Sequence, residues 1–207
     1  MDSEADGHHC TSGLNPWRAR CGEIRSAGSE GGPGKRIGRN ADTAPRSDPY
    51  TYLSCGEGDM FLCAIRDEHS RRVLGWAVDD HMRTELVTTA VDRAVFTRGG
   101  QVNDVVLHSD RGTQYTSHDM AAAAVTYGLR RSMGATGICW DNSGAESLWS
   151  TFKHEFYYRH TFATKAELIA AVDNWMRFYN HQRRHSSIGQ RSPITYERSL
   201  TVTLKAS

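Results

Sequence analysis

The sequence lacks the cysteine spacing, the long apolar run and the charge excess that mark several classes of protein. Its five cysteines are odd in number and include no Cys-x-x-Cys pair, which excludes a disulfide framework and a zinc ribbon. No stretch approaches the roughly 20 apolar residues of a membrane span, and the first residues show no basic-then-apolar signal pattern. We therefore expect a protein of the reducing cytoplasm, without a membrane partner.

The charge balance does not identify a partner either. Lys and Arg together number 25 against 24 Asp and Glu, so the formal net charge is +1. Nucleic-acid-binding proteins are often more basic, but the distribution of charge over the surface matters more than its sum. The 207 residues, 38% hydrophobic and 24% charged, suit one domain of ordinary size with extra segments.

The first 49 residues differ in composition from the rest. They are rich in Gly, Ser and Arg, contain few large aliphatic side chains, and show neither helical nor alternating periodicity. We expect residues 1–49 to be disordered. Residues 50–160 form the expected core, and residues 161–207 add a helix and a basic tail to the same module.

From Tyr50 onward the sequence alternates between strand and helix patterns. The expected strands are 50–55, 60–65, 72–78, 105–107 and 129–133, and the expected helices are 84–98, 117–127, one starting near 143, and 164–180. The first three strands follow one another closely, which indicates an antiparallel meander. Three strands followed by alternating helices and strands predict an α/β fold, with a mixed sheet covered by helices.

Asp110 closes the apolar strand 105–107 and its polar extension. A polar residue at the carboxyl end of a buried strand points into the crevice where α/β sheets commonly bind ligands. The residues alone slightly favour a simpler explanation, an aspartate in a turn before Arg111 and Gly112.

Glu146 lies in the first turn of the helix expected from Ser143. The two residues match a capping box, which is a structural explanation for the carboxylate. Asn142, Glu146, Ser150 and Lys153 are spaced to share one helix face, beside the apolar stripe. A carboxylate and a lysine two turns apart could serve a metal ion and a phosphate backbone together. A solvated glutamate and lysine explain the pattern equally well.

Four sequence blocks in order resemble the IS3-type insertion-sequence transposases. They are HSDRGTQY at 108–115, SMG at 132–134 with WDNSGAES at 140–147, Lys153 with Glu155, and YNHQRRH at 179–185 followed by Ser192-Pro193. The resemblance covers roughly residues 51–198. From Asp110 to Glu146 the numbering advances by 36, so thirty-five residues lie between them, the interval for which the D,D-35-E class is named.

The resemblance implies an RNase H-like fold, a five-stranded mixed sheet flanked by helices, with a retroviral-integrase-type catalytic core. It implies DNA strand cleavage and strand transfer by two Mg²⁺ or Mn²⁺ ions held by Asp110 and Glu146. Two such ions about 3.5–4 Å apart can activate the attacking oxygen and stabilise the leaving one. The implied partners are insertion-sequence ends, target DNA and further copies of the chain, with a nucleoid association when DNA is bound.

The same resemblance implies DNA contacts for a set of polar and basic residues. On the catalytic helix and just before it these are Lys153 and Asn142, and after the last expected helix they are Arg183, Arg184 and His185. Cationic side chains next to such a core are expected to contact phosphates. A solvated basic face is the ordinary alternative.

The first carboxylate of the triad departs from the family pattern. The family places an aspartate two residues before Thr-Tyr, and here Thr51-Tyr52 is preceded at that position by Pro49. Asp48, one residue further upstream, is the best candidate for a third metal ligand. Because Pro49 stands where the family has its first aspartate, and proline disfavours a central strand, we expect weak or absent activity. The resemblance ends abruptly beside this one-residue shift, which suggests a frameshifted or truncated N-terminus. A catalytically impaired DNA-binding remnant is the alternative function, and a nuclease that only hydrolyses is a second.

Asp67 is a further acidic candidate near the first strands. With Ser70 and Arg71 it matches the family's DxxSR block, which lies outside the metal triad. We expect Asp67 to have a structural role in an ion pair or a turn.

Overall fold

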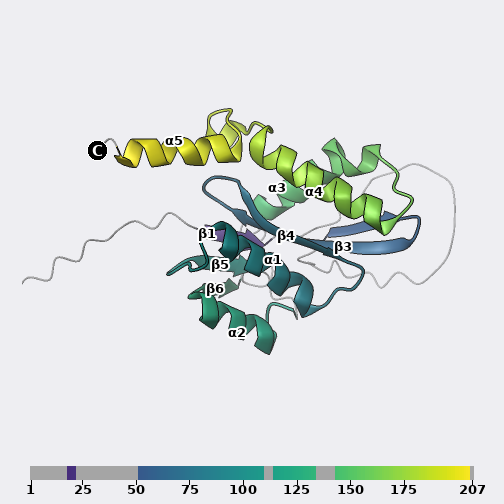
Figure 1. Ribbon diagram of the computed structural model, residues 1–207, viewed down its shortest axis with the longest axis horizontal. Coiled ribbons are helices and arrows are strands. Elements are labelled where there is room, and N and C mark those ends of the chain that lie inside the picture. Colours follow the sequence, from purple (N-terminus) through teal and green to yellow (C-terminus); the bar gives the residue numbers. More distant parts are fainter. Residues whose placement is uncertain (1–17, 22–50, 110–113, 134–142, 206–207) are drawn as a thin grey trace, which may run out of the picture.

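The computed structural model describes residues 18–21, 51–109, 114–133 and 143–205 and shows one mixed sheet with helices packed against it (Figure 1). The strands are β1 Arg18–Cys21, β2 Thr51–Cys55, β3 Gly58–Asp67, β4 Val73–Asp79, β5 Val106–Ser109 and β6 Arg130–Met133. The α-helices are α1 Thr84–Thr97, α2 His118–Tyr127, α3 Ser143–Glu155, α4 Lys165–His181 and α5 Pro193–Lys205. Short 3-10 helices at Tyr157–Arg159 and Ser186–Ile188 precede and follow α4.

The six strands fill five positions in the sheet. One edge of β3 pairs with β4 through Phe61–Arg66. The other edge pairs with β2 through Gly58–Leu62 and with β1 through Ile65–Asp67. β5 lies parallel to β1, and β6 lies parallel to β5. The predicted five-stranded width of the mixed sheet is confirmed, but the central position is divided between two separate segments, β1 and β2.

The disorder expected for residues 1–49 is wrong at Arg18–Cys21, because these four residues form β1. The sequence Arg-Ala-Arg-Cys is too short and too polar for its periodicity to indicate a buried strand. Both strands that pair with it lie far along the chain, so no local signal could predict the pairing. The other residues of 1–49 lie outside the described part of the chain.

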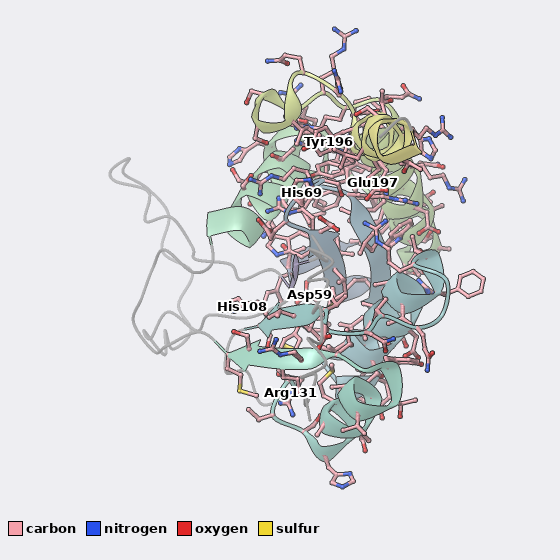
Figure 2. The ribbon with its side chains drawn as sticks, turned by 90° about the vertical axis from the view of Figure 1, so that its left-hand side faces the viewer. Asp59, His69, His108, Arg131, Tyr196 and Glu197 are labelled. Atoms are coloured by element: carbon pink, nitrogen blue, oxygen red, sulfur yellow. The ribbon has the colours of Figure 1, made fainter. Side chains whose placement is uncertain are left out.

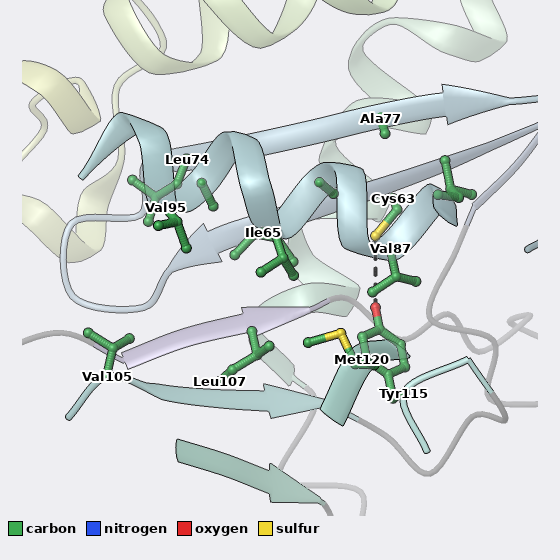
Figure 3. Packing of buried hydrophobic residues seen from close by; sticks show 14 residues of the cluster. Cys63, Ile65, Leu74, Ala77, Val87, Val95, Val105, Leu107, Tyr115 and Met120 are labelled. Atoms are coloured by element: carbon green, nitrogen blue, oxygen red, sulfur yellow. Dashed lines mark hydrogen bonds between the residues drawn. The ribbon is translucent and has the colours of Figure 1, made fainter. Parts of the chain in front are cut away.

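Side chains that alternate along β3 divide the core into two layers. Cys63 and Ile65 pack with α1 on what we call the α1 side, and Leu62 and Ala64 pack with α3 and α4 on the α3 side. Figure 3 shows the α1 side, where the Tyr115 hydroxyl lies 3.8 Å from the Cys63 sulfur. Because successive residues of a strand point to opposite faces, each position in the sheet can be assigned to one side.

Helix boundaries follow the capping signals of the sequence. The predicted capping box of α4 is present: Thr164 Oγ1 accepts from the Glu167 amide at 3.1 Å, and the Glu167 carboxylate accepts from the Thr164 amide at 3.2 Å. Gly99, predicted to follow the end of α1, has a φ of 96°, a conformation that glycine adopts without steric cost. These signals are local, which is why the sequence predicts them well.

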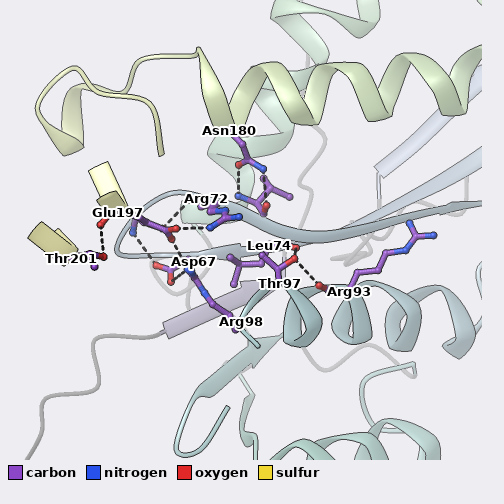
Figure 4. Close-up of polar contacts among 11 residues, drawn as sticks. Asp67, Arg72, Leu74, Arg93, Thr97, Arg98, Asn180, Glu197 and Thr201 are labelled. Carbon is purple, nitrogen blue, oxygen red and sulfur yellow. Dashed lines mark hydrogen bonds and ion pairs between the residues drawn. The ribbon is translucent and has the colours of Figure 1, made fainter. Parts of the chain in front are cut away.

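The basic tail forms a helix, α5, that the sequence does not predict. Glu197 on α5 accepts hydrogen bonds from Arg72 at 2.7 Å and from Arg98 at 2.5 Å. Arg98 also binds Asp67 at 3.0 Å, and the other Asp67 oxygen accepts from the Ser70 amide at 2.9 Å (Figure 4). The structural role predicted for Asp67, in an ion pair and a turn, is confirmed. The same network joins α5 to the end of α1 and to the turn between β3 and β4.

Gly75 in β4 marks the closest approach of the sheet to α1. A Cβ added at this position would overlap the carbonyl oxygen of Ala90 and the backbone nitrogen of Ala94, so the backbone of α1 would have to move. We expect Gly75→Ala to lower the free energy of unfolding by about 1–3 kcal/mol through overpacking. Urea unfolding followed by circular dichroism measures this. An unchanged midpoint would show that α1 can move away from β4 without loss of packing.

Candidate active site

The end of β5 leads directly to Asp110. Leu107 and Ser109 of this strand are buried, and β5 lies between β1 and β6, parallel to both. Parallel strands end at the same edge of a sheet, and that edge is where α/β proteins commonly bind ligands. Asp110 follows the last residue of β5 in sequence and itself lies outside the described residues, as does Asn142.

The second predicted ligand, Glu146, belongs to the first turn of α3. The position of its side chain lies outside the described part of the chain. The following turns anchor the helix, because Leu148, Trp149 and Phe152 are buried on the α3 side. α3 also lies against β1, the strand that neighbours β5. The helix that carries Glu146 therefore contacts the strand that lies beside β5.

The register of β3 tells which side of the sheet a residue in the central position faces. Thr51 pairs with Leu62, so counting back along a straight strand makes position 49 the partner of Ala64 and position 48 the partner of Ile65. Directly paired residues share a face. A strand that continued straight before Thr51 would therefore place position 49 on the α3 side and position 48 on the α1 side.

Asp48 and Pro49 themselves lie outside the described residues. The place opposite Ile65 in the central position is taken by Cys21 of β1. The four residues of β1 are Arg, Ala, Arg and Cys, so this strand contributes no carboxylate to the central position.

Polar contacts tie together the strands next to the predicted site. His108 Nδ1 of β5 lies 3.1 Å from Ser132 Oγ of β6. Arg131 on β6 donates to the backbone carbonyl of Tyr115. Figure 2 shows His108 and Arg131 on these adjacent strands. The sequence blocks include both strand ends, but only the fold reveals that His108 and Ser132 contact each other.

Two buried polar atoms on the α3 side have no hydrogen-bond partner in the described structure. They are the indole nitrogen of Trp149, whose residue is 2% exposed, and the hydroxyl of Thr51, whose residue is 0% exposed. Buried polar groups are nearly always hydrogen-bonded, so each exception needs an explanation. The sequence suggests only an apolar role for Trp149, as part of the helix stripe, and misses its free donor.

Lys153 lies two turns after Glu146 and is half-buried. Burial lowers the pKa of its amine from the usual value. Among the described residues it makes no ion pair and no hydrogen bond. A half-buried cation without a counter-charge is well suited to contact an external anion.

The three basic residues after α4 differ in what they can contact. Arg183 donates two hydrogen bonds to Glu155, at 2.7 and 2.5 Å, and so joins the ends of α3 and α4. Burial and the neighbouring Arg183 charge lower the pKa of His185 to about 4, so its ring is neutral near pH 7. Arg184 is exposed and makes no ion pair within the described structure.

One group of possible metal ligands occurs among the described side chains, at Asp79, Asp80 and His81 after β4. All three residues are exposed, and Asp80 pairs with Lys165 at 2.7 Å. The hydrogen bond from Lys165 holds the pKa of Asp80 well below its usual range. This group is separate from the predicted triad. The described helices include none with the length and hydropathy needed to cross a membrane.

Two family models, both described as integrase core domain, match residues 47–139 and 127–193. An uncharacterised 31 kDa protein of insertion element IS600 from Shigella sonnei is 33% identical over 160 residues, which cover 75% of this chain and 58% of the relative. The transposase InsF of insertion sequence IS3A from Escherichia coli is 37% identical over 148 residues, which cover 71% and 51%. The chain therefore spans little more than half the length of these relatives.

Solved structures show the same fold at low sequence identity. A structure described as a simian T-cell lymphotropic virus intasome in complex with PP2A regulatory subunit B56 gamma contains a chain that superimposes with a TM-score of 0.58. The two are 13% identical, and the match covers 71% of this chain and 51% of the other. The matched family models run together from residue 47 to residue 193, so the chain belongs to the integrase core domain family, in its IS3-type transposase branch, and has the RNase H-like fold.

Proposed function

We propose that this chain is the catalytic core of a DDE-type transposase, which cleaves DNA strands and transfers them with the help of two divalent metal ions. Asp110 and Glu146 are the proposed ligands. The observation that supports this most directly is the sheet topology: β5 ends immediately before Asp110, and α3, with Glu146 in its first turn, lies against the adjacent strand β1.

The donor set fits a hard cation such as Mg²⁺ or Mn²⁺, because both proposed ligands are carboxylates. When bound, two such ions would make the attacking oxygen more reactive and the leaving oxygen more stable. The chain's own contribution is to hold the carboxylates on rigid elements. The buried end of β5 and the buried stripe of α3 provide this rigidity.

Lys153 is the proposed phosphate contact of the catalytic helix. It lies half-buried and without a counter-charge among the described residues. Arg184 is the best proposed contact after α4, since Arg183 is engaged by Glu155 and His185 is neutral near pH 7. Asn142 remains a proposed DNA contact from its position before α3.

We expect Lys153→Ala to weaken DNA binding and to reduce the dependence of log K on log salt by about one unit, since one phosphate contact is lost. Fluorescence anisotropy with duplex DNA across a salt series measures this. Lys165→Ala is the matched control, because Lys165 is already paired with Asp80. If the parent and Lys153→Ala bind DNA with equal affinity at every salt concentration, Lys153 does not contact a phosphate and is only a solvated surface residue.

The catalytic proposal is tested by Asp110→Asn, which removes a metal ligand and leaves the size of the side chain almost unchanged. Nicking of plasmid DNA that carries element ends is measured with Mg²⁺ or Mn²⁺, in the chain as it stands and in the version with a restored first strand described in the Discussion. We expect any metal-dependent nicking to disappear in Asp110→Asn. The free energy of unfolding should stay within about 0.5 kcal/mol of that of the parent. Nicking that survives the substitution would overturn the assignment of Asp110.

A catalytically impaired remnant is the second candidate function. The observation that favours it is Pro49 at the position of the family's first aspartate: if the strand before Thr51 runs straight, position 48 would pair with Ile65 on the α1 side of the sheet. Asp48 could reach the α3 side only if the strand bulged by one residue, which is physically allowed. In this reading the chain keeps its fold and its DNA contacts and loses its chemistry.

The wider partners are proposals as well. Insertion-sequence ends and target DNA are the proposed substrates, and a homo-oligomer on paired ends is the proposed assembly. The proposed location is the cytoplasm, with association to the nucleoid when DNA is bound.

A further inference from the structure

We propose that Arg183 is a positioning residue for helix α3 and acts through Glu155, not through a DNA contact of its own. The Arg183 guanidinium holds the carboxylate at the end of α3, and the opposite face of the helix, with Glu146 and Lys153, is thereby presented to DNA. We call this contact between Arg183 and Glu155 the α3 clamp. DNA as the ligand of Lys153 is taken from the proposed function, on which the role of the clamp therefore rests.

The spacing of residues along α3 puts the clamp on the side away from the DNA-contacting face. Successive residues of a helix are about 100° apart around its axis. Glu146 and Lys153 are seven residues apart and therefore share one face, whereas Glu155 follows Glu146 by nine residues and lies about 180° away from it. A side chain that is fixed at Glu155 therefore sets the direction in which the face with Lys153 points.

The contact between Arg183 and Glu155 has the geometry of a strong ion pair. Arg183 Nε donates to one carboxylate oxygen at 2.7 Å, and Nη2 donates to the other at 2.5 Å. Two parallel hydrogen bonds fix the orientation of the two planar groups as well as their distance. The hydrogen bonds from Arg183 lower the pKa of Glu155, so its carboxylate stays ionised at neutral pH.

The guanidinium of Arg183 is held from two further sides. Its central carbon lies 5.9 Å from the centre of the Tyr179 ring, which is buried in the cluster between α3 and α4. Its Nη1 lies 3.2 Å from His185 Nδ1. Because a guanidinium can only donate hydrogen bonds, the His185 ring must accept, and burial keeps it neutral by lowering its pKa to about 4. All three guanidinium nitrogens are therefore engaged within the chain, which favours a positioning role over a phosphate contact.

The loop that carries His185 is itself fixed by backbone contacts. The His185 amide donates to the carbonyl of Arg191 at 3.0 Å, and the His185 carbonyl accepts from the Gln190 amide at 2.9 Å. The charges of Arg66 in β3 and Arg71 in the following turn oppose protonation of the ring as well. The acceptor that supports the clamp therefore persists at neutral pH.

The place of Glu155 in its helix also needs an explanation. It is the last residue of α3, and the carboxyl end of a helix carries partial negative charge, so a carboxylate there is unfavourable unless a cation pairs with it. Most exposed ion pairs contribute little to stability, but bidentate pairs and networks of several groups contribute more. The clamp is bidentate and is part of such a network. We infer that Glu155 stands there to hold Arg183.

The test is the DNA affinity of Glu155→Gln, measured by fluorescence anisotropy with duplex DNA across a salt series. Loss of a negative charge normally strengthens binding to a polyanion. We expect the opposite, a roughly threefold to tenfold weaker affinity, because one phosphate contact is lost when α3 no longer holds Lys153 toward DNA. Unchanged or tighter binding by Glu155→Gln would overturn the proposal.

Variants of Arg183 separate positioning from a direct contact. Arg183→Gln should weaken DNA binding about as much as Glu155→Gln, and the double variant should be no weaker, because the two residues act as one unit. Arg183→Lys keeps the charge but loses the two-pronged hydrogen bonding, so we expect it to behave like Arg183→Gln. Full affinity in Arg183→Lys, or additive losses in the double variant, would show that Arg183 contacts DNA directly.

Two further variants identify the residue through which the clamp acts. In the Lys153→Ala chain, Glu155→Gln should leave the remaining DNA affinity unchanged, and a further loss there would contradict the proposal. Glu85→Gln is the matched control, because it removes an exposed carboxylate from the first turn of α1. We expect no weakening of DNA binding in Glu85→Gln. Weakening equal to that of Glu155→Gln would remove the evidence for the clamp.

Hydrogen exchange distinguishes a failure of this inference from a failure of the proposed function. The amides of residues 150–155 should exchange faster in Glu155→Gln than in the parent, while those of α1 exchange as before. If the parent does not bind DNA at all, the proposed function fails, and the exchange of α3 alone decides whether Arg183 positions the helix. Equal exchange of α3 in the parent and in Glu155→Gln, or faster exchange of both helices alike, would overturn the clamp.

Discussion

Replacing residues 1–50 with a family-like segment that ends in Asp-Ile before Thr51 is expected to raise the strand-transfer rate by roughly 100-fold or more. A two-metal site that lacks one shared ligand loses the geometry on which both ions depend, and a factor of 100 corresponds to about 2.7 kcal/mol in the barrier. The new aspartate would stand at position 49, the partner of Ala64 on the α3 side, and not at position 48. Strand transfer of labelled element ends into plasmid DNA measures the rate.

Two matched versions of the restored chain test the reason for the gain. In the first, the order of the two residues before Thr51 is reversed, which puts the aspartate at position 50, opposite Cys63 on the α1 side, and we expect no gain. In the second, Asp110→Asn is added to the restored chain, and we expect the rate to return to its starting level. If the original chain transfers strands as fast as the restored one, Asp48 is a working ligand and the chain is not impaired.

Phe152→Ala is expected to lower the free energy of unfolding by about 3–5 kcal/mol. Phe152 is 0% exposed and connects α3 to α4, with its ring 4.9 Å from that of Trp175 in an edge-on arrangement and 5.8 Å from that of Phe156. Its removal leaves a cavity between the two helices that the surrounding side chains fill only in part. Urea unfolding gives the free energy, and strand transfer by the restored chain reports whether α3 still holds Glu146 in place.

Phe96→Ala is the matched control for this loss. It makes the same chemical change on α1, where the side chain is 84% exposed, so we expect a change within about 0.5 kcal/mol. Comparable losses in the two variants would mean that packing between α3 and α4 contributes little to stability.

Much of the fold could be predicted because its signals are local. The buried face of α4 follows from the spacing of Leu168, Val172 and Trp175, and its start follows from the capping box. The strands β2 to β6 begin and end within two residues of the expected positions, and β3, Gly58–Asp67, is two residues longer than expected at each end. β3 extends beyond its predicted end at residue 65 because its last residues pair with β1.

The helix α5 was missed for a related reason. Its segment reads as a basic tail, and the sequence pattern alone gives no partner for its polar residues. In the fold, Glu197 meets Arg72 and Arg98, which lie about a hundred residues or more away in sequence. A helix that depends on such distant charges has no signal within its own segment.

The candidate site also has some features that the sequence predicts and others that only the fold reveals. The identity of Asp110 and Glu146 and the interval between them could be read from the sequence, as could the mismatch at Pro49. The sequence does not show that Arg183 is hydrogen-bonded to Glu155 or that His185 is neutral near pH 7. Nor does it show that Lys153 is half-buried without a counter-charge in the described structure. Each depends on side chains brought together from separate elements.

The sequence by itself determined the family, the order of strands β2 to β6 and helices α1 to α4, and the residues available for chemistry, because periodicity, capping signals and motif blocks are properties of neighbouring residues. Only the tertiary structure decided that β1 and β2 share the central position of the sheet and which side each of its places faces. A strand's side chains alternate with a period of two, so a shift of one residue moves a carboxylate to the opposite face. That is why the difference between positions 48 and 49, one residue in the sequence, acquires its meaning only from the partners across the sheet.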